Sequence, residues 1–287
     1  MFTEDGYTIN YGKLSESFLK KAVKESGVNI DVLFSEKVKN IKKEGDFSIY
    51  TDNRLLNASV VAVAAGAHSL YFANLLGYGK EFSIFPVAGN FYFSKKTLNN
   101  KIYTSQLEKL PFAAIHGDPE VNNPGITRFG PTAIFVPLLE RRNFKTLWPY
   151  LKNFGFRWCT LVAGVKILDD KDIFKYISKN LFFTIPFVGK KLFLTEARKI
   201  IPSLRYSDIN LAKGYGGLRP QVINVRKSEL THGEAKIYGD KIIFNITPSP
   251  GASKCLKNAE LDTKKIIEFF GGKYTYNEEK INQELKD

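Results

Sequence analysis

The sequence has few cysteines and histidines, the residues that form disulfides or bind metals in small proteins. It contains two cysteines, Cys159 and Cys255, which lie far apart and form no CxxC motif. Its three histidines show no metal-ligand spacing either. Neither a disulfide framework nor a zinc site is therefore expected, and this cysteine usage fits a reducing, cytoplasmic compartment.

Long apolar runs are also missing. No stretch of 18 uninterrupted apolar residues occurs, so a membrane-spanning helix is not expected. The first residues, Met1-Phe2-Thr3-Glu4-Asp5, show neither the basic nor the apolar region of a signal peptide. With 287 residues, 44% of them hydrophobic, the chain can bury a sizeable core in one large domain or two smaller ones.

Positive charge is concentrated in one segment. Between Arg141 and Lys227 there are 18 Lys and Arg residues against 5 Asp and Glu, whereas the other 200 residues hold 24 of each sign. Such a field attracts anionic lipid, nucleic acid or acidic substrates. Nucleic acid is the least favoured of these, because the segment lacks any helix-turn-helix, RRM or zinc-finger signature.

Within this segment, basic residues alternate with apolar and aromatic ones such as Phe154, Phe156 and Trp158. This pattern is typical of an amphipathic surface that lies on an anionic membrane. It is equally compatible with a helical subdomain whose apolar residues pack inward while its lysines are solvated.

Hydrophobic periodicity predicts a mixture of helices and strands. Helices are predicted over 12–26, from Ala67 to Leu76, within 144–212 (one of them capped by Asp169-Asp170) and over about 252–270. Strands are predicted over 28–34, 37–43, 46–51, 55–64, 82–94, 101–107, 113–117, 126–137, 220–225, 234–238 and 241–246. The strands between 82 and 140 favour an antiparallel sheet, and the polar tail, 273–287, is expected to be frayed.

Two motifs have the form of cofactor-binding turns. The buried strand that ends in Ala64-Ala65-Gly66-Ala67 would let a ligand approach the backbone closely, although an ordinary strand-to-helix turn has the same sequence. The loop from Pro248 to Ser253 opens a helix, and the free N–H groups there form an anion site. An ordinary capped helix is an equally good interpretation of that loop.

Two further motifs carry candidate catalytic side chains. Arg219 follows a run of glycines, and its planar guanidinium suits a carboxylate, although a single arginine more often forms a surface salt bridge. His116 ends a strand beside Gly117, where it can face a cleft and act as a base. A lone histidine is more often structural, and we expect this of His68 and His232.

In this order, and over about residues 7–272, the motifs resemble FAD-dependent oxidoreductases of the D-amino-acid-oxidase-like class. Asn10-Tyr11-Gly12-Lys13-Leu14, Arg128-Phe129-Gly130-Pro131 and Leu218-Arg219-Pro220-Gln221 add to the resemblance. Within that class the chain is most similar to the malate:quinone oxidoreductases, and next to L-2-hydroxyglutarate dehydrogenase. The resemblance implies oxidation of (S)-malate to oxaloacetate, with electrons passed to quinone at the inner face of the cell membrane.

The resemblance also implies an α+β architecture and a division into domains. Residues 1–78 and 233–272 would form the α/β remainder of an FAD-binding domain, followed by the polar tail, 273–287. Residues 79–232 would form an antiparallel-sheet substrate domain with a basic helical insert at 144–212.

Individual site residues follow from the same resemblance. His116 would take the proton of the substrate 2-hydroxyl, Arg219 would hold the C1 carboxylate, and Arg128 is a weaker candidate for a second carboxylate. The residues expected to contact FAD are Val38 at the adenine, Ala65 and Gly66 near the phosphate and ribitol, and Pro250, Gly251, Ala252 and Ser253 at the pyrimidine edge.

The sequence departs from the family at one point. Members of the family begin with a strand, a GxGxxG turn and a helix that hold the FAD pyrophosphate. No GxGxxG occurs here. We expect that Met1 is an internal start or that another chain supplies this unit. Two alternatives stay open: L-2-hydroxyglutarate as the substrate, and a non-catalytic fragment or membrane-associating module.

Overall fold

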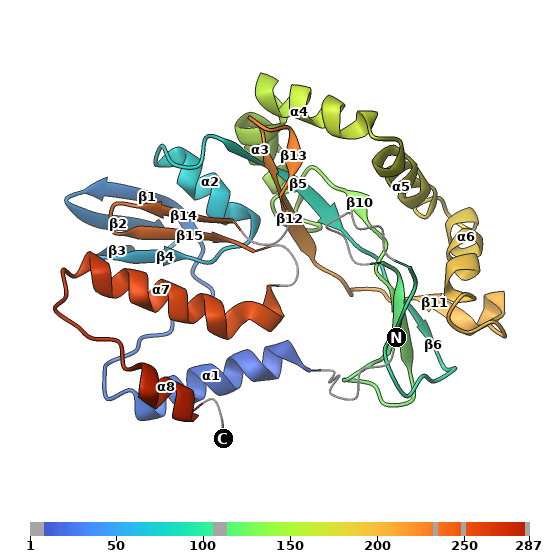
Figure 1. The fold of residues 1–287 in the computed structure, drawn as a ribbon, viewed down its shortest axis with the longest axis horizontal. Coiled ribbons are helices and arrows are strands. Elements are labelled where there is room, and N and C mark those ends of the chain that lie inside the picture. Colours follow the sequence, from blue (N-terminus) through green and yellow to red (C-terminus); the bar gives the residue numbers. More distant parts are fainter. Residues whose placement is uncertain (1–8, 106–113, 232–234, 248–250, 285–287) are drawn as a thin grey trace. The chain divides into compact units, whose positions relative to one another are not determined.

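The computed structural model describes residues 9–105, 114–231, 235–247 and 251–284 (Figure 1). The chain divides into two compact units: Met1–Leu33 with Ser83–His232, called unit 1, and Phe34–Phe82 with Gly233–Asp287, called unit 2. Both contain helices and antiparallel sheets. The mixed α+β class expected from the sequence is confirmed.

Unit 2 contains two three-stranded sheets. In the first, β1 (Val38–Glu44), β2 (Asp46–Thr51) and β3 (Leu55–Ala58) form an antiparallel meander. In the second, the order is β14 (Ala235–Gly239), β15 (Ile242–Ile246) and β4 (Val61–Val63). β15 runs antiparallel to β14 but parallel to β4, with Phe244 opposite Val63.

Helices cover the second sheet on both faces. Figure 1 shows α2 (Ala67–Leu75) on one side and α7 (Cys255–Phe269) on the other. Asp262 of α7 accepts hydrogen bonds from Lys236 and Asn245, which are cross-strand neighbours. A strand covered on both faces needs apolar residues on both, and Ile242, Ile243 and Phe244 are accordingly all fully buried.

Unit 1 contains two larger sheets. The five-stranded sheet has the order β11 (Ile209–Leu211), β6 (Tyr92–Ser94), β9 (Thr127–Gly130), β8 (His116–Pro119) and β7 (Ile102–Tyr103), all antiparallel. The four-stranded sheet has the order β10 (Ile134–Phe135), β5 (Phe82–Ala88), β12 (Leu218–Asn224) and β13 (Glu229–Leu230).

The helices of unit 1 include α1 (Tyr11–Glu25), α3 (Leu147–Tyr150), α4 (Trp158–Asp169), α5 (Lys171–Phe182) and α6 (Val188–Ala197). Phe193 of α6 stacks on Tyr92 of β6, and both belong to a core cluster with Phe129. One face of the five-stranded sheet is therefore apolar and covered by helix. None of the helices in the described ranges is long and apolar enough to cross a membrane.

Most predicted elements are confirmed, including the helix over 12–26, the helix that ends near Leu76 and the helix capped by Asp170. The strand predicted over 28–34 is wrong: no strand forms there, and Val28 and Phe34 are exposed. The run 82–94 is two strands, because the chain crosses between the sheets of unit 1 at Gly89–Phe91. The predicted frayed tail contains a helix, α8 (Glu278–Glu284), which Asn277 begins by accepting a hydrogen bond from the Lys280 N–H.

Candidate active site

The second face of the five-stranded sheet is polar. Asp118 of β8 lies opposite Arg128 of β9, and His116 lies opposite Gly130. Because side chains alternate along a strand, these residues point away from the face on which Phe129 packs against α6. The strand register thus gathers a histidine, a carboxylate and a guanidinium on one surface.

His116 is set up as a proton acceptor. Its imidazole is buried, and Nδ1 lies 3.0 Å from the carbonyl oxygen of Ala114. Since a carbonyl oxygen only accepts hydrogen bonds, Nδ1 carries the proton and Nε2 keeps its lone pair. Burial, followed by the positive charge of Lys101, lowers the pKa of His116 to about 4 against the opposing effects of Ala114 and Asp118. At neutral pH the ring is therefore an uncharged base.

Arg128 is engaged by acidic side chains. Its Nη2 donates to Oδ2 of Asp118 at 2.8 Å, its Nε donates to Oδ1 at 3.3 Å, and Nη1 lies 3.5 Å from Oε2 of Glu120. Both acidic side chains are buried. The guanidinium thus balances two internal charges, which leaves less of it free for a carboxylate ligand.

Arg219 is in the opposite situation. It is the second residue of β12, and no carboxylate or hydrogen-bond acceptor within the described ranges pairs with its guanidinium. Burial lowers its pKa, and the nearby Tyr176 of α5 acts in the opposite direction. An arginine nevertheless stays charged, and an unbalanced charge with little solvent contact favours an anionic ligand. Arg219 and His116 lie in different sheets, and no hydrogen bond or ring contact of the described residues joins them.

Sequence reasoning missed Arg141. Its Nη2 donates to Oδ1 of Asn90 at 2.6 Å, and its Nη1 donates to the carbonyl of Tyr215 at 2.8 Å. Both acceptors are neutral. A Cβ at Gly216, where φ is +90°, would collide with this guanidinium and with the carbonyl of Gly89. The glycine run before Arg219 could have pointed to such a contact, because glycines allow a side chain to approach the backbone closely. The sequence does not show that this side chain is Arg141.

Unit 2 places two of the predicted cofactor segments at one sheet edge. Because β4 and β15 are parallel, their carboxyl ends lie at the same edge. Ala65 and Gly66 follow β4 and lead into α2, while Gly251, Ala252 and Ser253 follow β15 and lead into α7. This edge, with a helix N-terminus after each strand, is where open α/β sheets bind anionic ligands. Pro250 lies outside the described residues.

The turn after β4 offers exposed backbone with no side chain over it. Gly66 has a φ of +58°, and a Cβ there would meet nothing within 4 Å. Oγ of Ser69 accepts from the Ala65 N–H and donates to the carbonyl of Val63, which fixes the turn. Val38 begins β1 in the other sheet of the unit, and no strand pairing in the described part of the chain joins it to β4.

Curated relatives cover nearly the whole chain, although no family model matches it. The chain is 44% identical over 283 residues to a probable malate:quinone oxidoreductase of Campylobacter jejuni, which is 97% of this chain and 62% of the relative. It is 42% identical over 275 residues to the malate:quinone oxidoreductase of Helicobacter pylori strain 26695 and to a probable one of Helicobacter acinonychis, 94% of this chain and 61% of each relative. The chain thus spans about three-fifths of the length of the curated relatives it matches. Over nearly all of its own length, it is a homologue of the malate:quinone oxidoreductases.

Proposed function

We propose that this chain forms the substrate-oxidising part of an FAD-dependent malate:quinone oxidoreductase of the D-amino-acid-oxidase-like class. The names of the relatives support malate as the substrate and quinone as the acceptor. The observation that carries the proposal is the hydrogen bond between Nδ1 of His116 and the Ala114 carbonyl, because it leaves Nε2 as an unprotonated base on a buried, neutral ring.

His116 is the proton acceptor in this proposal. Nε2 takes the proton of the malate 2-hydroxyl while the hydrogen on C2 leaves with its electron pair, which gives the keto group of oxaloacetate. FAD, when bound, supplies the acceptor for that hydride. A well-placed general base of this kind contributes about 10²–10⁴-fold to the rate.

Two arginines hold the carboxylates of the substrate. Arg219 takes the C1 carboxylate, because its half-buried guanidinium lacks an internal counter-charge among the described residues. Arg141 takes the second carboxylate in preference to Arg128, because its present acceptors are a neutral amide and a backbone carbonyl, whereas Arg128 already balances Asp118 and Glu120. A dicarboxylic acid matches two such sites better than a monocarboxylic one.

The exposed turn at Ala65 and Gly66 fits the close approach of a cofactor, since no side chain stands over its backbone. Gly251, Ala252 and Ser253, with Pro250, would take the pyrimidine edge of FAD, where the start of α7 offers free N–H groups. Val38 would meet the adenine through its backbone. Quinone lies in the membrane. We therefore assign the basic segment between Arg141 and Lys227 to peripheral contact with the cytoplasmic face of that membrane.

The test is turnover of malate with a soluble quinone analogue by the intact protein. His116→Gln should lower kcat by at least about a hundredfold, because the base is lost. His68→Gln, which changes a histidine of α2, is the matched control and should keep wild-type turnover. Unchanged kcat in His116→Gln would remove His116 from this role, and a protein without a flavin absorbance band would contradict the cofactor. Parallel kinetics with L-2-hydroxyglutarate distinguish the two substrates.

A further inference from the structure

The outer side of the helical segment of unit 1 carries large apolar side chains. Trp158, Leu161, Val165 and Leu168 recur along α4 at intervals of three and four residues, so they form one stripe along the helix. All four are exposed, Trp158 at 76% and Val165 at 70%. A helix in a water-soluble protein normally turns such a stripe inward, so this stripe indicates an apolar partner.

The exposed apolar surface continues at the junction of α5 and α6. Leu181 and Phe182 at the end of α5 are exposed, and Phe187, directly before α6, is 84% exposed. Phe187 also has a φ of +60°, an unfavourable conformation for an aromatic residue. The loop therefore presents this ring outward even though its backbone is strained.

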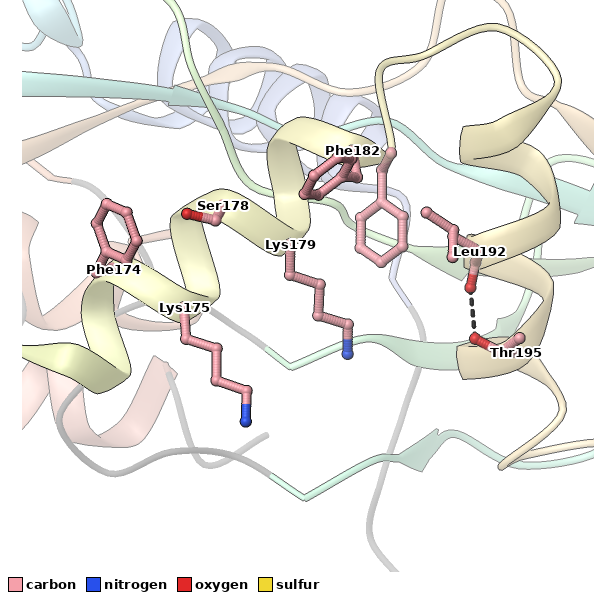
Figure 2. A pocket seen from close by; sticks show the side chains of 8 residues that line it. Phe174, Lys175, Ser178, Lys179, Phe182, Leu192 and Thr195 are labelled. Atoms are coloured by element: carbon pink, nitrogen blue, oxygen red, sulfur yellow. Dashed lines mark hydrogen bonds between the residues drawn. The ribbon is translucent and has the colours of Figure 1, made fainter.

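A groove lies between α5 and α6 (Figure 2). Its volume is about 490 Å³, which is within the range of about 300–1,000 Å³ for small-molecule sites. The lining residues are Phe174, Lys175, Ser178, Lys179, Phe182 and Phe183 from the α5 side, and Leu192 and Thr195 from α6. The Thr195 hydroxyl donates to the Leu192 carbonyl of its own helix, so it adds little polarity to the wall.

The charges beside this groove are positive. Lys179 pairs with Glu196 at 2.8 Å, whereas Lys175 has no ion pair with any described residue. The surrounding segment, from Arg141 to Lys227, holds 18 basic residues against 5 acidic ones. An apolar groove with an unbalanced ammonium beside it matches a molecule that combines a hydrocarbon chain with a negative group.

We propose that the groove between α5 and α6 binds one acyl chain of an anionic phospholipid, with Lys175 at the headgroup phosphate. In this proposal, the exposed stripe of α4 and the ring of Phe187 contact the surface of the same membrane. A quinone would fit the apolar walls but has no charge to balance Lys175. A second copy of the chain would bring the same positive excess and would be repelled. The inference deepens the membrane contact of the proposed function and rests on it, and its own support is the groove with Lys175 and the exposed apolar side chains beside it.

The two tryptophans of the chain provide the readout. Trp148 and Trp158 both lie in this segment and are exposed. We expect the intact protein to bind vesicles of phosphatidylcholine with phosphatidylglycerol at low salt, and brominated acyl chains to quench its tryptophan fluorescence. Vesicles of phosphatidylcholine alone should bind at least tenfold more weakly.

Two variants address the groove itself. Ser178→Phe fills it without changing the charge, and Phe182→Asp makes its wall polar and acidic. Both should weaken binding to the anionic vesicles at least fivefold. The matched control is Phe34→Asp in unit 2, since Phe34 is 78% exposed and lies outside this segment, and it should bind as wild type does.

The proposal would be overturned if anionic vesicles caused no quenching or if neutral vesicles bound equally well. Binding of Ser178→Phe to anionic vesicles as tightly as wild type would also overturn it. So would binding of a quinone analogue in the absence of vesicles, if Ser178→Phe abolished that binding. Self-association that Phe182→Asp disrupts would assign the face to a second copy instead. The proposed function is tested separately, because Ser178→Phe should keep turnover with a soluble quinone and His116→Gln should keep vesicle binding.

Discussion

Arg128 donates two hydrogen bonds to Asp118, its direct neighbour across the β8–β9 strand pair. The Asp118 side chain is 2% exposed. Its Oδ2, which accepts from Nη2 of Arg128, also lies 3.9 Å from Nζ of Lys101. The charges on this face therefore balance one another away from solvent. In such a network, the loss of one partner leaves another charge buried without compensation.

Arg128→Met should therefore destabilise the protein more than it affects substrate binding. We expect a loss of about 3 kcal/mol in the free energy of unfolding. This is the low end of the range for removing one partner of a buried ion pair, because Arg128 keeps some solvent contact. Urea denaturation measures the loss. The double variant Arg128→Met with Asp118→Asn should recover part of it, since one unbalanced charge is removed. A stable Arg128→Met protein with a strongly raised KM for malate would show instead that Arg128 binds substrate.

Arg219→Met should give the reverse pattern. Its guanidinium has no counter-charge among the described residues, so its removal should leave the free energy of unfolding unchanged or slightly raised. The KM for malate should rise about tenfold to a hundredfold, because a charge-assisted contact to the substrate is lost. The matched control is Arg226→Met, which changes an exposed arginine in the turn between β12 and β13. Equal KM values for the two variants would exclude Arg219 from carboxylate binding.

Lys101→Met should shift the pH dependence of turnover. The base works unprotonated, so kcat/KM should be constant above the pKa of His116 and fall as the pH drops through about 4. Lys101 lowers this pKa, so its removal should move the acid limb to higher pH. Asp118→Asn should move the limb to lower pH, since Asp118 raises the pKa. Lys95→Met, an exposed lysine of the same sheet region, should leave it in place, and comparison between variants cancels the titration of malate itself. Shifts in the same direction for Lys101→Met and Asp118→Asn would contradict this account.

Gly216→Ala and Gly214→Ala separate backbone strain from a collision. Both glycines have a positive φ, but a Cβ at Gly214 meets nothing within 4 Å, whereas a Cβ at Gly216 collides with Arg141. Each alanine should cost about 1 kcal/mol through its backbone conformation. Only Gly216→Ala should lose more than this and also raise the KM for malate, because Arg141 is displaced. Identical unfolding and kinetics for the two variants would show that Arg141 is not held by this contact.

Local patterns predicted much of the fold. The apolar spacing of α1 and α7, the cap at Asp170 and the apolar runs of β4 and β15 are properties of short segments, and all of these elements form, although burial alternates along β4, where Ala62 is exposed. The strand predicted over 28–34 failed because β-propensity does not ensure a pairing partner. The breaks at Gly89–Phe91 and Pro131–Ala133 depend on how two sheets meet, which no single segment encodes.

The candidate site could be predicted only in part for the same reason. A histidine beside glycine at a strand end led to His116, but its protonated nitrogen follows from the position of the Ala114 carbonyl. Arg128 and Arg141 look alike in the sequence. They differ because the strand register places Asp118 beside Arg128, whereas Arg141 meets only Asn90 and a backbone carbonyl.

The parallel pairing of β15 with β4 has a consequence for biosynthesis. These strands are about 180 residues apart, and all of β5 to β13 lies between them. On the ribosome, β4 emerges long before its neighbour exists, while the intervening segment can already collapse around Phe129 and Phe193. The second sheet of unit 2 must therefore wait until β15 has been translated, and β4 stays without its final partner until then.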